Sequence, residues 1–125
     1  MIKERKKITE VSSEILCQSV VKGMQERKGL EIVVLDLRNV KSAITDYFVI
    51  CSGTSDTQID ALADSVEEEV WKDIQANPWK REGKMQKEWI LIDYVDVVVH
   101  VFKKDRREFY KLEELWGDAE FTYYE

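Results

Sequence analysis

The chain has 125 residues, a mass of 14.7 kDa and a formal net charge of −6 at pH 7. This length fits one domain, since domains commonly contain about 100–150 residues, and such a chain can bury a hydrophobic core without disulfides or metals. The acidic balance argues against nucleic acid as the main ligand, because phosphate-binding domains usually carry a basic excess. We expect a single domain over residues 1–125, with a core at about 8–119 and a tail at 118–125.

The first 52 residues predict one helix followed by two strands. Apolar residues recur at three- and four-residue spacing over residues 8–28, which is the pattern of an amphipathic helix, and Gly29 ends it. The β-branched run 31–37 predicts a strand. A second strand is predicted over 47–52, where weak alternation is typical of a strand covered on both faces.

A capping box begins the second predicted helix. Ser55 and Gln58 have the Ser-x-x-Gln spacing, in which the two side chains satisfy free backbone N–H groups at a helix start. The apolar stripe continues to about Gln75, and the exposed face of the helical segment 59–74 is acidic. A short extra strand fits the polar, basic stretch 79–85.

The last third of the chain predicts a hairpin and a final helix. The apolar runs 89–93 and 95–102 indicate two strands, and their tight junction favours antiparallel pairing. Asp105 with Glu108 can cap a helix that ends at Gly117. The order of all these elements indicates an α/β (α+β) domain, with a single mixed sheet of four to five strands flanked by helices.

Cysteine, histidine and hydropathy patterns argue against several classes of function. The chain has two cysteines, Cys17 and Cys51, and one histidine, His100, too few for a Cys/His zinc site of about four ligands. Both cysteines lie in apolar stretches and are expected to be buried free thiols. No apolar run approaches the roughly 20 residues that cross a bilayer, and residues 1–7 do not resemble a secretory signal. We expect a cytoplasmic protein that does not contact membranes.

The turn Gly53-Thr54-Ser55 leads from a predicted strand into a helix N-terminus, where backbone N–H groups can hold a phosphate. A Gly-Ser turn of this kind occurs in nucleotidyltransferases, which also need an acidic D-x-D pair to hold Mg²⁺. No such pair follows this turn in the sequence. We therefore favour a structural helix cap, and a nucleotidyltransferase-like enzyme that uses this turn is the alternative.

Three polar residues near the predicted hairpin have both a structural and a functional interpretation. Asp93 and Asp96 can shape the hairpin turn through local hydrogen bonds or contact a partner, and general acid–base chemistry is the alternative. His100 lies within a strand, where a structural role is favoured over partner binding or catalysis. The sequence shows no specific catalytic constellation.

Aromatic side chains in the second half of the chain favour a protein partner instead. Trp and Tyr are among the residue types that dominate the energy of protein interfaces, and Trp79 and Trp89 flank the basic stretch. Tyr94 is expected at the hairpin tip, and Tyr110 and Trp116 on the last helix. Burial of Trp89 and Trp116 in the core is the alternative.

Four stretches of the sequence together resemble the Iojap-type ribosomal silencing factors. They are Asp36-Leu37, Ile44-Thr-Asp-Tyr-Phe-Val-Ile-Cys-Ser-Gly-Thr-Ser55, Trp89-Ile-Leu-Ile-Asp-Tyr-Val-Asp-Val-Val-Val-His-Val-Phe102 and Arg107-Glu-Phe-Tyr-Lys-Leu-Glu-Glu-Leu-Trp116. Their order makes the resemblance specific, and it covers about residues 8–119. Val95 departs from it, because many relatives have Gly there, and the segment 121–125 extends past the usual end of the family.

The resemblance implies a fold and a function. The fold would be nucleotidyltransferase-like without the catalytic acids, so that the protein would be no enzyme and would need no cofactor. Such factors bind large-subunit ribosomal protein fourteen where the small subunit docks, and they repress translation by blocking subunit joining. Organelle relatives act in large-subunit assembly. A homodimerisation module is a further alternative, since relatives self-associate when free.

The resemblance also suggests where the partner would bind. Trp89 would be the aromatic anchor, with Asp93, Tyr94 and Asp96 as polar residues at the rim and His100 as a hydrogen-bonding or packing contact. Lys84 is a weaker candidate, because its loop is not a motif of the family. Ribosomal RNA would be contacted only peripherally, and we expect the acidic helix 59–74 to keep other surfaces away from it.

Overall fold

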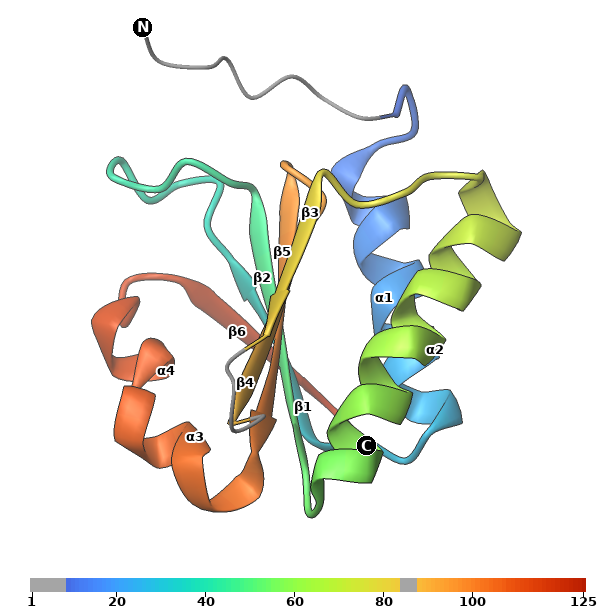
Figure 1. Ribbon diagram of the computed structural model, residues 1–125. Coiled ribbons are helices and arrows are strands. Elements are labelled where there is room, and N and C mark those ends of the chain that lie inside the picture. The colour runs from blue at the N-terminus through green and yellow to red at the C-terminus, as the bar shows by residue number, and fades with distance from the viewer. Residues whose placement is uncertain (1–8, 84–87) are drawn as a thin grey trace, which may run out of the picture.

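The computed structural model describes residues 9–83 and 88–125, which form one mixed sheet with helices on both of its faces (Figure 1). Their elements are, in chain order, α1 (Ser13–Glu26), β1 (Leu30–Asp36), β2 (Tyr47–Gly53), α2 (Asp56–Ile74), β3 (Lys80–Gly83), β4 (Trp89–Asp93), β5 (Val97–Lys103), α3 (Lys104–Tyr110), α4 (Leu112–Leu115) and β6 (Glu120–Tyr124). No described helix is long and apolar enough to cross a bilayer.

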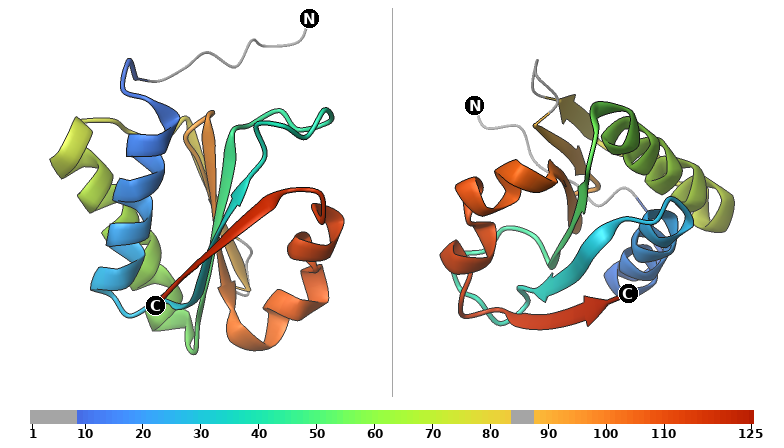
Figure 2. Two further views of the ribbon diagram at one scale, coloured as in Figure 1. Left: turned by 180° about the vertical axis from the view of Figure 1, so that it is seen from behind. Right: turned by 90° about the horizontal axis from the view of Figure 1, so that it is seen from below.

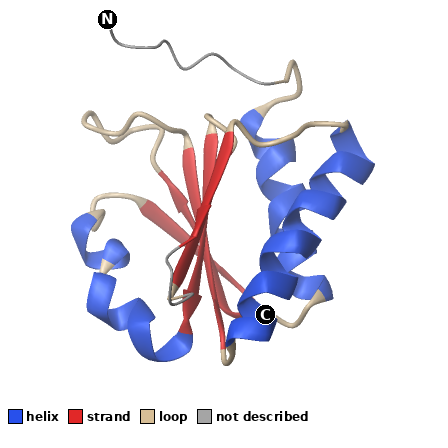
Figure 3. Ribbon diagram, in the orientation of Figure 1, coloured by secondary structure: helices blue, strands red, loops and turns tan. Residues whose placement is uncertain are grey.

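The described strands form a sheet in the order β3-β4-β5-β2-β1-β6. Strands β2 and β5 are parallel, and every other neighbouring pair is antiparallel. Helices α1 and α2 cover one face, and the short helices α3 and α4 lie on the other (Figure 2, Figure 3). The predicted mixed sheet, the hairpin of β4 and β5, and the extra strand within 79–85 are therefore confirmed.

The predicted strand count was too low, because the segment 118–125 is not a free tail. Residues 120–124 form β6, which pairs antiparallel with β1 at the edge of the sheet. Phe121 packs against the smaller of two apolar clusters, which gives this strand its tertiary anchor. The tail prediction was wrong because a short polar-aromatic segment carries little strand signal until its partner strand is known.

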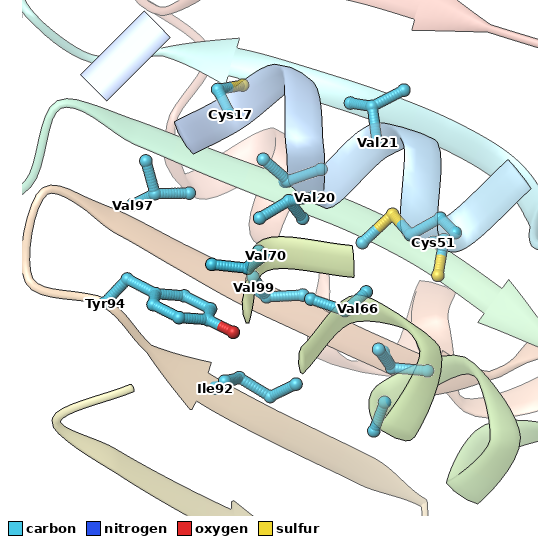
Figure 4. Close-up of a cluster of buried hydrophobic side chains, with 14 of the residues drawn as sticks. Cys17, Val20, Val21, Cys51, Val66, Val70, Ile92, Tyr94, Val97 and Val99 are labelled. Carbon is cyan, nitrogen blue, oxygen red and sulfur yellow. The ribbon is translucent and has the colours of Figure 1, made fainter. Parts of the chain in front are cut away.

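The larger apolar cluster lies between the sheet and the helices α1 and α2 (Figure 4). The two helices approach closely at Gly23, where an added Cβ would lie 2.7 Å from the Cα of Val66. The Ser65 hydroxyl donates to the Gly23 carbonyl at 2.7 Å, which fixes the helices against each other. Cys17 and Cys51 belong to this cluster as free thiols, as predicted.

The opposite face of the sheet carries a smaller cluster. Its fully buried residues are Val33, Leu35, Leu37, Ile50 and Phe102. Leu112 and Trp116 are partly buried against it, which agrees with the core alternative for Trp116. Val40 and Ala43, from the loop between β1 and β2, also pack against this cluster. Part of the face stays open, because Phe48, Trp89 and Leu91 are partly exposed.

The last predicted helix is two helices. Lys111 adopts a left-handed conformation with φ of 52°, which ends α3, and α4 begins at the next residue. The predicted cap of Asp105 with Glu108 was wrong: α3 starts at Lys104, and no side chain caps it. At the other end of the chain, α1 starts at Ser13 with Ser12 as its cap, five residues later than predicted.

The hairpin turn between β4 and β5 is shaped by Asp93. Its Oδ1 accepts from the Val95 N–H at 2.7 Å, which confirms the structural interpretation of this residue. Val95 has a φ of 73°, and the Asp96 N–H donates to the Tyr94 carbonyl at 2.9 Å. These are features of a γ-turn, which is strained for a β-branched residue.

Candidate docking surface on the aromatic face of the sheet

The open part of the sheet carries a connected set of rings that we call the aromatic face. It consists of Phe48 on β2, Trp89 on β4, His100 and Phe102 on β5, and Trp116 after α4. These rings contact one another with centroid separations of 4.6–6.2 Å. The aromatic face lies on the side of the sheet that α1 and α2 do not cover.

Trp89 is partly exposed and is held in place by two neighbours on β5. Its indole Nε1 donates to the Nδ1 of His100 at 3.1 Å. Its ring stacks on Phe102, with centroids 5.1 Å apart and planes inclined by 27°. Because His100 and Phe102 already hold this partly exposed indole in one orientation, it has little rotamer freedom left to lose when a partner binds, which favours its use as an anchor.

His100 supports the surface from beneath and does not itself reach solvent. The side chain is 3% exposed, and burial lowers the pKa of His100 to about 3. Because Nδ1 accepts the indole hydrogen bond, the proton of the neutral ring is on Nε2. No described residue lies within hydrogen-bonding distance of Nε2. The ring is therefore an acceptor for Trp89.

A small pocket of about 130 Å³ lies beside Trp89. Glu82 and Gly83 of β3 line one side of it, and Leu91 of β4 lines another. Glu82 and Leu91 are opposite each other in the β3–β4 pair, so that both project from the face that carries Trp89. The pocket gives the aromatic face a recess of the size of one partner side chain.

The other predicted site residues lie elsewhere. Asp93 is buried, and Tyr94 is 0% exposed, with its ring in the cluster beneath α1 and α2 (Figure 4). Their expected role as polar contacts at the rim conflicts with this burial. Asp96 is partly buried, and its carbonyl accepts from the N–H groups of Asp46 and Tyr47. Lys84 lies outside the described residues. Only Trp89 and His100 are brought together.

Sequence reasoning missed two partly exposed residues of this surface, Phe48 and Leu91. Phe48 contacts both His100 and Trp116, although its strand was predicted to be covered on both faces. Leu91 is partly exposed beside Trp89. Strand alternation was the available signal, because residues 89 and 91 share one face of β4.

The turn at Gly53-Thr54-Ser55 is closed by its own side chains. The Ser55 hydroxyl accepts from the Gln58 N–H at 3.1 Å, and the Gln58 Oε1 accepts from the Thr54 N–H at 2.7 Å and from its hydroxyl at 3.0 Å. Asp56 pairs with Lys103 at 2.9 Å. A phosphate would have to displace Gln58 and would face the Asp56 carboxylate. The predicted cap by Ser55 is confirmed, whereas the Gln58 side chain bonds the N–H of Thr54, one residue before the N-cap, so the capping box forms only in part.

The comparisons with known proteins agree with this reading of the chain. Residues 9–124 match the family model described as "Ribosomal silencing factor during starvation". A ribosomal silencing factor of Halalkalibacterium halodurans is 42% identical over 110 residues, covering 87% of this chain and 92% of that protein. A mouse protein named for mitochondrial assembly of the ribosomal large subunit is 37% identical over 75 residues, 58% of this chain and 32% of its own length.

A solved structure supports the same assignment. A crystal structure of a protein from Chromobacterium violaceum superposes with a TM-score of 0.79 at 30% sequence identity. The superposition covers 86% of this chain and 88% of that one. The family match extends from residue 9 to 124 and so includes β6, which the resemblance drawn from motifs alone had left out. The chain belongs to the family of ribosomal silencing factors.

Proposed function

We propose that this protein is a non-enzymatic factor that binds the large ribosomal subunit through its aromatic face and blocks joining of the small subunit. The docking partner would be large-subunit ribosomal protein fourteen. The observation that carries the proposal is the partly exposed Trp89, held by His100 and Phe102 on an open sheet face. Family membership supports it, and so does the large-subunit assembly named for the mouse relative.

The proposed mechanism is steric. A stable protein interface buries about 800 Å² on each partner, and a few anchor residues supply most of its energy. A rigid sheet seated by such an anchor would fill the space that an intersubunit contact needs. Repression would then require only that the factor bind the large subunit more tightly than the small subunit does. No covalent bond would be made or broken.

Each residue of the predicted site has a role in this proposal that follows from its position. Trp89 would contact the partner directly, and His100 would orient it from below. Asp93 and Tyr94 would act indirectly, by shaping the hairpin and anchoring it to the core. Asp96, at the other end of β4 from Trp89, would contact only the edge of a partner.

The acidic surface of α2 supports an orientation on the ribosome. Two of its carboxylates, Asp64 and Glu67, are partly neutralised by Arg81 of β3, at 2.9 and 2.7 Å. Lys22 of α1 pairs with two more, Glu69 and Asp73, at 3.1 and 3.6 Å. The acidic excess that is left on α2 would repel ribosomal RNA and leave the opposite, aromatic face to dock. Contact with ribosomal RNA would therefore be peripheral to the protein contact.

The test is co-sedimentation with cognate large subunits, with Trp71→Ala as the matched control. Trp71 is 52% exposed on α2, the helix that covers the face of the sheet opposite to the aromatic face (Figure 1). We expect Trp89→Ala to lose co-sedimentation and to restore subunit joining, with its fold verified by circular dichroism, while Trp71→Ala behaves as wild type. Loss of binding in Trp71→Ala alone would place docking on the helical face and refute the proposed surface.

The enzyme alternative has its own test. Wild-type protein would be titrated with ATP and Mg²⁺ by isothermal calorimetry. We expect no heat of binding, because the Gln58 side chain already accepts from the Thr54 N–H and the Ser55 hydroxyl already accepts from the Gln58 N–H. Saturable binding that Gln58→Ala strengthens would instead support a nucleotide site there.

A further inference from the structure

One buried guanidinium links four elements of the fold. Arg107 on α3 is 7% exposed. Its Nη1 donates to the Glu31 carbonyl of β1 at 2.6 Å and to the Ser52 hydroxyl of β2 at 3.1 Å. Its Nε and Nη2 donate to the two carboxylate oxygens of Glu113 on α4, at 3.3 and 3.1 Å. This fork-to-fork pairing is the strongest geometry available to an arginine and a carboxylate.

The break between α3 and α4 is what allows Glu113 to reach Arg107. In a continuous helix, residues six positions apart point about 120° away from each other. The left-handed Lys111 turns the chain between them, with its N–H donating to the Arg107 carbonyl at 3.2 Å. A non-glycine residue adopts this conformation at a cost. The Arg107–Glu113 pair offsets that cost.

The helix α4 has few other attachments. It has four residues, and none of them is buried. Its first residue, Leu112, and the residue after it, Trp116, are partly buried against the smaller cluster. The Trp116 ring stands edge-on to Phe48 at 5.7 Å, and Phe48 stands edge-on to His100 at 4.6 Å. The position of α4 therefore fixes one border of the aromatic face.

We propose that Arg107 is a positioning residue for the aromatic face: its pair with Glu113 sets α4, and α4 sets the Trp116 ring. The part of this proposal that concerns binding rests on the proposed function. Replacing Glu113 leaves the buried Arg107 guanidinium without its counter-ion, and the surrounding structure shifts to relieve it. Movement of α4 is the cheapest such shift, because α4 contributes no buried residue.

The adjacent Glu114 provides a matched control. Its side chain is 75% exposed and lies 4.0 Å from Lys111. Glu113→Gln and Glu114→Gln remove the same charge from the same helix at neighbouring positions, but only the first removes the partner of Arg107. Arg107→Lys is the second variant, because it keeps the charge and loses the fork.

The experiment records the indole N–H resonances by two-dimensional NMR, with Trp116 assigned through Trp116→Phe, and large-subunit affinity by co-sedimentation. We expect Glu113→Gln and Arg107→Lys to shift or broaden the Trp116 resonance and to weaken binding by about 2- to 30-fold, the range for residues that act on a site indirectly. Glu114→Gln should change neither. A general loss of structure would move the Trp71 resonance as well.

Each other outcome decides against part of the proposal. An unchanged Trp116 resonance in Glu113→Gln would refute the positioning role. A shifted Trp116 with wild-type affinity would show that α4 does not border the docking surface. If wild-type protein itself fails to bind large subunits, the proposed function is refuted, and the NMR comparison still decides whether Arg107 positions α4.

Discussion

The indole of Trp89 and the imidazole of His100 form one unit, joined by the 3.1 Å hydrogen bond from Nε1 to Nδ1. The bond needs a neutral histidine, because a protonated ring has no acceptor. Burial provides that neutrality by lowering the pKa of His100 to about 3. The orientation of the surface tryptophan therefore depends on a buried base on the neighbouring strand, and this dependence leads to the first prediction.

Protonation of His100 should couple stability to pH. The unfolded chain binds a proton at His100 below about pH 6.5, whereas the folded chain does so only near pH 3. The unfolding free energy should therefore fall as pH decreases through this window, by up to about 1.4 kcal/mol per pH unit. Urea unfolding at pH 7.0, 6.0 and 5.0 measures the slope.

The control for this prediction is His100→Phe, which keeps a ring at the site and removes the titration. Asp36 and Asp73 have pKa values lowered by hydrogen bonds, to Arg38 and Ser19 respectively. The stability that these two carboxylates contribute is lost only at more acidic pH, and both are present in wild type and in His100→Phe. Equal slopes for wild type and His100→Phe between pH 7.0 and 5.0 would contradict a role for His100.

Gly23→Ala should destabilise the protein even though alanine is the better helix former. In an open helix this change would stabilise by about 0.5–1 kcal/mol. At Gly23 the new Cβ would lie 2.7 Å from the Val66 Cα and 2.9 Å from the Ser65 carbonyl oxygen, both backbone atoms. We expect a loss of about 1–3 kcal/mol in thermal or urea unfolding, as for an overpacked core.

Gly117→Ala is the matched control for the close approach of the two helices. Its added Cβ would meet only the Glu114 carbonyl oxygen at 3.5 Å, which is an ordinary contact. This variant should unfold within about 0.5 kcal/mol of wild type. A Gly23→Ala protein as stable as Gly117→Ala would show that α1 and α2 can separate without cost.

Tyr94→Phe should leave large-subunit binding unchanged and should not reduce stability. The ring is fully buried, and no described residue lies within hydrogen-bonding distance of its hydroxyl. Removing a buried polar group without a partner recovers its desolvation cost, about 1 kcal/mol. Differential scanning calorimetry and co-sedimentation measure the two quantities. A loss of binding with intact stability would return Tyr94 to the docking surface.

Both cysteines should resist thiol reagents in the folded protein. Burial raises the pKa of Cys17 and of Cys51 to about 12, so that almost no thiolate exists at pH 8. Ellman's reagent should report no fast reaction in buffer and two equivalents in 6 M guanidinium, matching the two cysteines of the sequence. Rapid labelling of one thiol in buffer would reveal local opening of α1 or β2.

Local signals predicted the parts of the fold that local chemistry determines. The Ser55 hydroxyl caps α2 as the Ser-x-x-Gln spacing indicates, although the Gln58 side chain reaches one residue further back, to the Thr54 N–H. The alternation of Ile90, Ile92 and Tyr94 also predicts that Tyr94 is buried, since all three residues share one face of the hairpin. We expected Tyr94 to be exposed because it lies at a hairpin tip, but in the structure its ring is packed in the cluster beneath α1 and α2.

The remaining errors concern features that only tertiary contacts determine. Lys111 is neither Gly nor Pro, so the break between α3 and α4 has no sequence signal and depends on the ion pair of Arg107 with Glu113. Strand β6 likewise depends on β1, a partner far away in the sequence. The candidate site was half predicted for the same reason. Trp89 and His100 lie on β4 and β5, two strands of one predicted hairpin, whereas Phe48 lies beside His100 only because β2 is the other neighbour of β5 in the sheet.

The parallel pairing of β2 with β5 has a consequence for how the chain folds during its synthesis. Tyr47 lies opposite Val97, so the centre of the sheet closes a long loop that includes α2, β3 and β4. Closing such a loop is slow, because its entropy cost arises before the strand contacts form that offset it. A growing chain cannot assemble the surface around Trp89 until β5 has been synthesised, and β1 stays an open edge until β6 follows. Because Trp116 also follows β5 in the chain, no nascent fragment that ends before Trp116 carries the complete aromatic face.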